Sequence, residues 1–358
     1  MTGKMKAQVF YEPLKMKLEE IDIPQIADDQ VLVRVKACGI CGSDVAYYYG
    51  DSPLETPDGK GPLVLGHEFS GEVVEVGALP SKLGLFKPGD RVVVDPLQYC
   101  NACEICKKGQ VNLCEKKTVL GVSVNGGFAE YCASHYTGLH KLPDNVSFEH
   151  GSLAEPLADA VYALRKSQIA LGDFAVVIGP GAIGLMMVQL LKSSGAGKVA
   201  LVGTRDYRLE VGKSMGADVI INNSEKKSKY YTPDLKAAIS DLTDGKFADV
   251  VMTPTGSVPA MESAFEISGR RSRIVFFGLP GANDFIKIPA LNTIFGDKTI
   301  LFSWLAPLTW PTALNALANN LVDVKPLITH SIKLADLVQG IADVKSRAGD
   351  VMKAVVTI

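Results

Sequence analysis

The stretch that decides the fold is FAVVIGPGAIGLMMVQLL, residues 174–191. This uncharged run is long enough to suggest a membrane-spanning helix. Glycines and a proline interrupt its middle, so a buried strand, a tight turn and a helix explain it better. We therefore expect a strand over 174–179 and a helix over 182–193, and no membrane span.

The turn between them matches the pattern G-x-G-x-x-G over residues 179–184. Gly179 would permit the tight turn, Gly181 would let the backbone approach a pyrophosphate, and Gly184 would let the helix pack closely on the strand. The helix N-terminus would add N–H donors and a favourable dipole. The alternative is an ordinary strand–helix turn that binds nothing.

Strands and helices alternate from about residue 157 onward. Further strands are predicted at 198–203, 218–222, 248–256, 273–280 and 299–304, with a helix at 208–215. Such alternation predicts a parallel, doubly wound sheet with helices on both faces. We assign residues 157–296 to this dinucleotide-binding domain.

The end of the second strand bears on the choice of cofactor. An acidic residue about 20 positions after the glycine turn would bind the adenosine ribose of NAD, but Gly203 stands there. Arg205 and Arg208 follow, and guanidinium groups suit a 2′-phosphate. This favours NADP over NAD and predicts that Gly203→Asp shifts preference toward NAD. Asp206 keeps the NAD interpretation open, since a small shift of the loop would bring it to the ribose.

Residues 1–156 show a different sequence pattern from the alternating strands and helices that follow. Short β-like runs at 31–40, 71–77 and 90–96 are separated by frequent Gly and Pro, which predicts an antiparallel, barrel-like domain. Helices are expected at 311–321 and near 334–347, followed by a strand at 353–358 that could rejoin this domain. We therefore expect the domain to be discontinuous, comprising 1–156 and 297–358.

Composition excludes several classes of protein. The chain has 358 residues, 47% hydrophobic and 21% charged, with a net charge of −2. This excludes dominant disorder and gives no sign of a nucleic-acid or membrane partner. The first residues carry no apolar segment of a signal peptide, so a cytoplasmic location is expected.

Four of the seven cysteines form C-x2-C-x2-C-x7-C, at Cys100, Cys103, Cys106 and Cys114. Four thiolates at this spacing fit a closed, tetrahedral, structural zinc site. An iron–sulfur cluster is the less favoured alternative, because the site lies beside a dinucleotide fold. Four unrelated core cysteines are the remaining one.

A second constellation is scattered along the chain. Cys41 lies in GICGSD, His67 and Glu68 in GHE, and Glu155 in LAEPL. A thiolate, an imidazole, a carboxylate and water would make an open, catalytic zinc site. Each signal alone is weak, since GHE is often a surface turn and a lone cysteine is usually in the core. Cys38 and Cys41 also form C-x-x-C, but no thioredoxin-like context supports a redox pair.

These motifs together resemble the zinc-dependent medium-chain dehydrogenases/reductases, and within them the polyol branch of sorbitol (L-iditol) and galactitol-phosphate dehydrogenases. The resemblance rests on GICGSD (39–44), GHEFSGEVVEVG (66–77), KPGDRV (87–92), the four-cysteine loop, GGFAEY (126–131), AEPLA (154–158), GPGAIG (179–184) and VKPLITH (324–330). It implies a GroES-like catalytic domain, a Rossmann domain, and a homo-oligomer, either a tetramer or a dimer.

The resemblance also implies roles for individual residues. Cys41, His67 and a glutamate would hold the catalytic zinc; Glu68 is the usual third ligand, and Glu155 contacts the metal-bound water or becomes a ligand itself. Ser43 would begin the proton relay. The cofactor-binding residues implied are Gly179, Gly181, Ala182, Ile183, Gly184, Gly203, Thr204, Arg205, Arg208 and Thr255.

Two departures from animal sorbitol dehydrogenases bear on the substrate. Their relay histidine is replaced by Ala46, and we count the next residue, Tyr47, among the candidate catalytic residues. Asp44, in contrast, agrees with the family, because it matches the carboxylate that orients the liganding histidine. An Arg-Tyr pair helps to hold the polyol in the animal enzymes, and Ser303 and Trp304 stand in its place here. Galactitol-phosphate-type relatives also carry Ser-Trp at these positions.

The function implied is hydride transfer between the secondary hydroxyl of a polyol, or the matching ketose, and NAD(P) with the help of zinc. One alternative is a zinc dehydrogenase of another secondary alcohol or of an amino alcohol such as threonine. A non-catalytic, crystallin-like relative is a third, disfavoured because Cys41, His67, Glu68 and Glu155 are all present.

Overall fold

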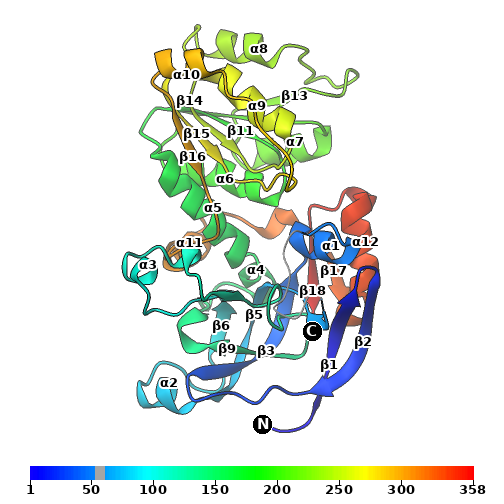
Figure 1. The fold of residues 1–358 in the computed structure, drawn as a ribbon. Helices are drawn as coiled ribbons and strands as arrows, with labels where there is room; N and C mark the ends of the chain where they lie inside the picture. The colour runs from blue at the N-terminus through cyan, green and yellow to red at the C-terminus, as the bar shows by residue number, and fades with distance from the viewer. Residues whose placement is uncertain (53–60) are drawn as a thin grey trace. The chain divides into compact units, whose positions relative to one another are not determined.

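The computed structural model describes residues 1–52 and 61–358, and its chain divides into two units. Unit 1 comprises Met1–Pro156, Trp310–Ala318 and Val324–Ile358, and unit 2 comprises Leu157–Thr309 and Asn319–Asp323. Each unit has its own hydrophobic core. Figure 1 shows both units, with many of their helices and strands labelled.

Unit 2 is built on a parallel sheet of six strands in the order β13-β12-β11-β14-β15-β16. The strands are β11 (Phe174–Ile178), β12 (Lys198–Gly203), β13 (Val219–Asn222), β14 (Ala248–Thr253), β15 (Ser268–Phe276) and β16 (Thr299–Phe302). All five residues of β11 are buried, because a parallel strand at the centre of a sheet is covered on both faces. The predicted doubly wound parallel sheet is confirmed.

The helices of unit 2 follow the strands in alternation. They are α5 (Ala154–Ser167), α6 (Ala182–Ser193), α7 (Asp206–Ser214), α8 (Leu235–Leu242), α9 (Val258–Ile267) and α10 (Ala290–Phe295), and α5 begins three residues before the division between the units. α6 packs on β11 and β12, and α9 packs on β14 and β15. Met261, Ala264, Phe265 and Ile267 of α9 are buried, whereas in α6 all residues from Gly184 to Leu191 are buried.

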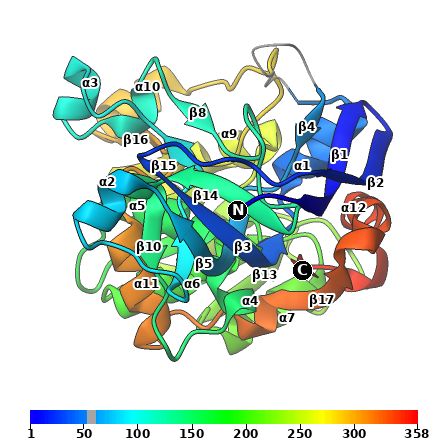
Figure 2. The same ribbon diagram turned by 90° about the horizontal axis from the view of Figure 1, so that it is seen from below.

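Unit 1 contains a seven-stranded sheet in the order β10-β6-β5-β3-β18-β17, with β9 pairing on β3. Its strands are β3 (Gln30–Gly39), β5 (Glu68–Val76), β6 (Arg91–Val94), β9 (Tyr131–His135), β10 (Leu139–Lys141), β17 (Ile328–Lys333) and β18 (Lys353–Thr357). Figure 2, which views the chain from below, shows β3 beside β5. Valines and leucines of these strands, among them Val31, Leu32, Val33, Val92 and Val94, are buried in the core of unit 1.

Smaller elements complete unit 1. A second sheet has the order β2-β1-β4, and β7 pairs with β8. These strands are β1 (Lys4–Glu12), β2 (Lys15–Asp22), β4 (Leu63–Val64), β7 (Leu97–Gln98) and β8 (Thr118–Val119). The helices are α1 (Gly42–Tyr49), α2 (Ala78–Lys82), α3 (Glu104–Lys107), α4 (Phe148–Gly151), α11 (Trp310–Ala318) and α12 (Leu337–Ser346).

Two late segments of the chain, Trp310–Ala318 and Val324–Ile358, belong to unit 1. β18 pairs antiparallel with β3, with Val356 opposite Cys38. The second part of unit 1 begins later than the expected residue 297, because β16 pairs in parallel with β15 and extends the sheet of unit 2. Unit 2 therefore continues to Thr309.

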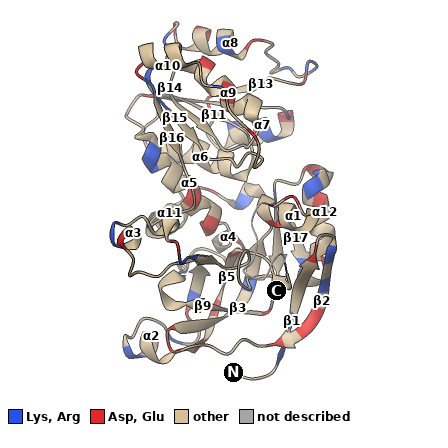
Figure 3. Cartoon of the chain, viewed as in Figure 1, with Lys and Arg blue, Asp and Glu red and all other residues tan. Residues whose placement is uncertain are grey.

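The distribution of charged residues and the lengths of the apolar helices are as expected from a chain of nearly balanced charge. Figure 3 shows Lys and Arg interspersed with Asp and Glu along both units. Within the described part of the chain, no helix has both the length and the apolar character needed to cross a bilayer.

Candidate functional site: two metal centres and a dinucleotide loop

The four-cysteine motif folds into a compact cluster of sulfur atoms around α3. Its members, Cys100, Cys103, Cys106 and Cys114, place their Sγ atoms within 4.8 Å of one another. The Cys100 Sγ lies 3.9 Å from that of Cys106 and 3.6 Å from that of Cys114. Zinc–sulfur bonds of about 2.3 Å in a tetrahedron place sulfurs about 3.8 Å apart, so the cluster has the dimensions of a zinc site.

Backbone N–H groups donate to two sulfur atoms of the cluster. The N–H of Cys103 donates to the Cys100 Sγ at 3.4 Å, and the N–H of Cys106 donates to the Cys103 Sγ at 3.5 Å. Hydrogen bonds from the N–H groups of Ala102 and Cys103 lower the pKa of the Cys100 thiol to about 6. A lowered thiol pKa favours metal binding, because the thiolate is the ligand.

The second cluster brings together Cys41, His67 and Glu68. One ligand atom from each lies within 4.8 Å of the other two. Cys41 is the N-cap of α1, and Glu68 begins β5, so the cluster stands where a helix start meets a strand start. Three donors of these types leave a fourth coordination position open, as catalytic zinc sites do.

Asp44 holds the geometry of this cluster. Its Oδ2 accepts from the Cys41 N–H at 2.8 Å, and its Oδ1 accepts from the Gly66 N–H at 3.3 Å. Its Oδ1 also lies 3.5 Å from the His67 Nδ1, which leaves the Nε2 for a metal. The Ser43 Oγ lies 3.4 Å from that Nε2, so the predicted relay hydroxyl is beside the cluster.

The electrostatics of the cluster favour a cation. Burial opposes protonation of His67, but the charges of Asp44 and Cys41 outweigh it and raise the pKa of the imidazole well above its ordinary value. A divalent metal would supply the positive charge that these acidic neighbours attract. The residues present therefore fit a zinc ion.

A buried lysine of β18, Lys353, was missed by the sequence reasoning. Its Nζ donates to the Glu68 Oε1 at 2.6 Å and to the Ile40 carbonyl at 3.2 Å, and it forms an ion pair with the Glu68 Oε2. The only signal for it in the sequence is a lysine at the start of the apolar run KAVVTI.

The remaining predicted residues of unit 1 lie in different surroundings. Glu155 is buried in the first turn of α5 and interacts electrostatically with Lys353, but it is not part of the three-residue cluster. Tyr47 is 2% exposed, and its hydroxyl donates to the Val122 carbonyl at 3.2 Å. Cys38 is fully buried, and burial raises the pKa of its thiol well above the ordinary value, which disfavours redox chemistry with Cys41.

The glycine motif forms the turn between β11 and α6. Gly179 has φ of +124°, and a Cβ on Gly184 would lie 1.9 Å from the Gly179 carbonyl oxygen, so both positions require glycine. A Cβ on Gly181, the N-cap of α6, would meet nothing within 4 Å. That open space, at a helix start formed by Ala182 and Ile183, suits a pyrophosphate. Thr255 borders the turn, since a Cβ on Gly179 would lie 3.4 Å from its Cβ.

The loop after β12 gives Gly203 a steric role. A Cβ there would lie 2.5 Å from the Pro180 Cγ and 2.6 Å from the Pro180 Cδ. An acidic side chain therefore does not fit position 203 while Pro180 occupies the turn. The expected gain of NAD preference from Gly203→Asp alone must be revised for this reason.

The other residues of this loop are placed as follows. Thr204 is exposed, and Arg205 and Arg208 are half-buried at the start of α7. Asp206 accepts hydrogen bonds from the Asn222 Nδ2 at 2.8 Å and from the Ser228 Oγ at 2.6 Å. These bonds direct the Asp206 carboxylate toward β13, which disfavours it as the ribose ligand.

The chain matches two family models. Residues 27–144 match the alcohol dehydrogenase GroES-like domain, and residues 182–319 match the zinc-binding dehydrogenase domain. The matched ranges contain Cys41, His67 and Glu68 in the first and the start of α6 in the second.

Relatives and solved structures extend the likeness over the whole chain. D-arabitol-phosphate dehydrogenase of Enterococcus avium is 34% identical over 94% of this chain and 92% of its own length. Sorbitol dehydrogenase of Bacillus subtilis is 33% identical over 92% and 90%. L-threonine 3-dehydrogenase of Bacillus velezensis is 34% identical over 95% of each chain.

Among solved structures, a zinc-binding dehydrogenase of Sinorhizobium meliloti bound to NADP superposes with a TM-score of 0.90, at 27% identity over 99% of this chain and 100% of that one. Galactitol-1-phosphate dehydrogenase of Escherichia coli superposes with a TM-score of 0.86, at 26% identity over 99% and 100%. Since whole-chain relatives exceed 30% identity and both family models match, the chain belongs to the zinc-dependent medium-chain alcohol dehydrogenases, which are NAD(P)-dependent oxidoreductases.

Proposed function

We propose that the chain transfers hydride between the secondary hydroxyl of a polyol, free or phosphorylated, and NADP. The observation that carries the proposal is the open cluster of Cys41, His67 and Glu68 with the Ser43 hydroxyl beside it. Three donors and a neighbouring hydroxyl are what activation of an alcohol at a metal requires.

In this proposal, each residue of the cluster has a defined task. Cys41, His67 and Glu68 would hold zinc, which would lower the pKa of a substrate hydroxyl, and the nicotinamide cofactor would supply the hydride acceptor. Asp44 fixes the Cys41 backbone and the His67 ring through the contacts described above. Ser43 passes the proton of the substrate hydroxyl on toward solvent, and Glu155 acts on the cluster through its electrostatic interaction with Lys353. The four-cysteine cluster holds a second, structural zinc.

The polyol assignment draws on the relatives. Two whole-chain relatives are named for sugar alcohols, one of them phosphorylated, and so is one of the structural neighbours. A second candidate is an amino alcohol, because an L-threonine 3-dehydrogenase is equally similar. The two substrates differ in charge, so a substrate panel separates them.

The cofactor preference follows from the loop after β12. Gly203 lacks a carboxylate, Asp206 is engaged by Asn222 and Ser228, and Arg205 and Arg208 stand at the start of α7. Two guanidinium groups without a competing carboxylate favour a 2′-phosphate. A structural neighbour bound to NADP is consistent with this choice.

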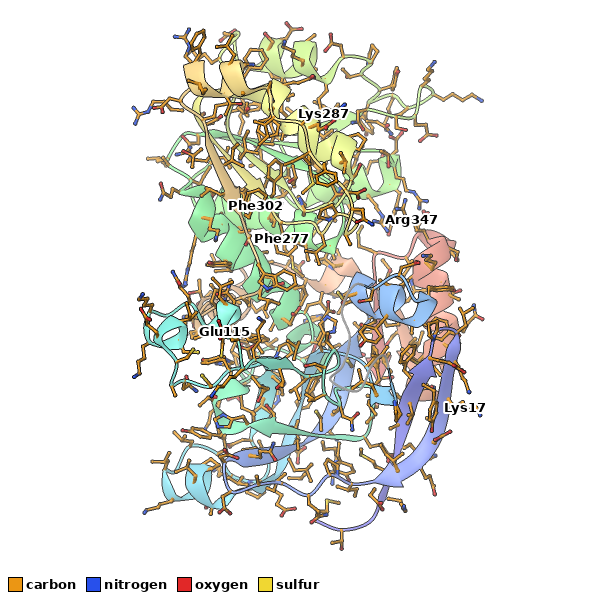
Figure 4. The ribbon with its side chains drawn as sticks, viewed as in Figure 1. Lys17, Glu115, Phe277, Lys287, Phe302 and Arg347 are labelled. Carbon is orange, nitrogen blue, oxygen red and sulfur yellow. The ribbon has the colours of Figure 1, made fainter. Side chains whose placement is uncertain are left out.

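A homo-oligomer in the cytoplasm completes the proposal. Among the described residues, β16 is the last strand of its sheet, so one of its edges has no strand partner there. Phe302 at its end is 61% exposed, and Phe295 and Ile294 of the preceding α10 are 77% and 71% exposed; Figure 4 labels Phe302. An unpaired edge beside exposed apolar side chains suits a second copy of the chain.

The experiment is a panel of free polyols, phosphorylated polyols and L-threonine, assayed with NADP and with NAD, on protein of known zinc content. The proposal expects two zinc ions per chain and the highest kcat/KM with a polyol and NADP. One zinc per chain, or highest kcat/KM with L-threonine, would contradict it.

A further inference from the structure

We infer that Lys353 is a positioning residue of the open metal centre, which competes with the metal for the Glu68 carboxylate and thereby keeps Glu68 an exchangeable ligand. This inference rests on the proposed function, because it assumes that Cys41, His67 and Glu68 bind zinc. It assigns a role to a residue of the last strand, β18, that lies far along the sequence from the cluster.

The contacts show a socket built for this pair. The side chains of Lys353 and Glu68 are 8% and 1% exposed, and both Glu68 oxygens face the ammonium group. Gly39, opposite Glu68 in the sheet, leaves room for them: a Cβ there would lie 2.2 Å from the Glu68 Oε2 and 3.2 Å from the Lys353 Cε. The Ile40 carbonyl accepts a further hydrogen bond from the Lys353 Nζ at 3.2 Å.

The same carboxylate also faces the metal centre. One Glu68 oxygen lies within 4.8 Å of ligand atoms of Cys41 and His67. A metal bound there would therefore share Glu68 with a buried ammonium group. Two cations that bind one carboxylate repel each other, so each weakens the binding of the other. Because the site is buried, solvent and salt screen this repulsion little.

As a consequence, the Glu68 carboxylate should dissociate from the metal more readily than a carboxylate ligand without a neighbouring ammonium group. Replacing Lys353 with an apolar side chain removes the competing cation and leaves Glu68 to the metal. We expect zinc release from the open centre to slow by about tenfold, which corresponds to about 1.4 kcal/mol.

The test measures zinc release from the intact holoenzyme to a chromogenic chelator, together with zinc content and melting temperature. The variants are Lys353→Met, Lys353→Gln, Lys353→Arg and the double variant Lys353→Met/Glu68→Gln. Lys298→Met is the matched control, because the Lys298 Nζ is also partly buried but donates to the Phe265 and Ser268 carbonyls of unit 2. Lys353→Gln keeps a polar side chain and serves if Lys353→Met does not fold.

We expect wild type to release zinc in two phases, the faster one from the open centre. Lys353→Met and Lys353→Gln slow that phase by about tenfold, Lys353→Arg keeps it within about twofold of wild type, and Lys298→Met leaves it unchanged. The double variant loses the slowing, because the effect of Lys353 acts through Glu68.

Failure of the inference and failure of the proposed function give different results. If wild type carries one zinc per chain, the open centre itself is refuted. If wild type carries two, and both charge-removing variants release zinc as fast as wild type or faster, then Lys353 only neutralises a buried charge and the inference is overturned.

Discussion

Replacing Gly203 with aspartate tests whether the dinucleotide loop selects its cofactor by sterics or by charge. An added Cβ would lie 2.5 and 2.6 Å from two Pro180 atoms and 3.3 Å from the Leu209 Cδ2. Carbon atoms in ordinary contact are about 3.5–4.0 Å apart, so the Pro180 ring must move by about 1 Å. Overpacking of this kind costs about 1–3 kcal/mol.

That cost falls on nucleotide binding as well as on stability. Pro180 lies between Gly179 and Gly181, so its displacement disturbs the turn proposed to hold the pyrophosphate. We expect Gly203→Asp to weaken binding of both NADP and NAD by about 5- to 150-fold, the equivalent of about 1–3 kcal/mol. Pro180→Ala/Gly203→Asp removes the clashing ring and lets the carboxylate act, which shifts preference toward NAD.

Each nucleotide is titrated into the protein, and its binding is measured from the quenching of protein fluorescence. Pro180→Ala alone is the matched control. Melting curves without nucleotide separate loss of fold from loss of binding. If Gly203→Asp alone melts like wild type and binds NAD as tightly as wild type or more tightly, the steric argument is refuted.

Three further predictions concern single side chains. Cys41→Ser should lower kcat by about 100-fold or more while the melting temperature stays near that of wild type, since a hydroxyl is a poor zinc ligand; near-normal kcat would remove Cys41 from the metal centre. Cys103→Ala should lower the melting temperature by about 5 °C or more and abolish its sensitivity to a chelator, whereas an unchanged melting curve would argue against a structural zinc. His140 stacks on Trp310 at 5.3 Å, and burial lowers the pKa of its imidazole to about 4. The imidazole of His140 takes up a proton near pH 6.5 in the unfolded chain but only near pH 4 in the folded chain. The free energy of unfolding is therefore highest above pH 6.5 and falls as the pH is lowered toward 4. The expected decrease between pH 7 and pH 5 is about 2 kcal/mol. Denaturant unfolding at both pH values should show this loss in wild type and a smaller one in His140→Phe, and equal losses would contradict the assignment.

The sequence was sufficient where local chemistry and hydrophobic periodicity agree. The strand and helix flanking the glycine turn could be predicted because an unbroken apolar run stops at glycines that only a tight turn requires. The four-cysteine cluster could be predicted from spacing, since all its ligands belong to one loop.

Features that depend on contacts distant in sequence could not be predicted from residues alone. The Lys353–Glu68 pair joins residues 285 positions apart, and a single lysine in an apolar strand carries no sign of its partner. The conflict between Pro180 and position 203 arises only when β11 and β12 lie side by side. The extent of unit 2 to Thr309 likewise depends on the pairing of β16 with β15, for which the residues gave only a short apolar run.

The position of β18 between β3 and β17 has a consequence for biosynthesis. Lys353–Thr357 leaves the ribosome after all of unit 2, so the central sheet of unit 1 stays incomplete while the second unit already has its full sequence. During that interval the edge of β3 that receives β18 is open to other strands, and the Glu68 carboxylate lacks its lysine. The nascent chain should therefore be prone to wrong strand pairing until β18 has been synthesised, and fusions or truncations at residues 353–357 should reduce the yield of folded protein more than changes to α2.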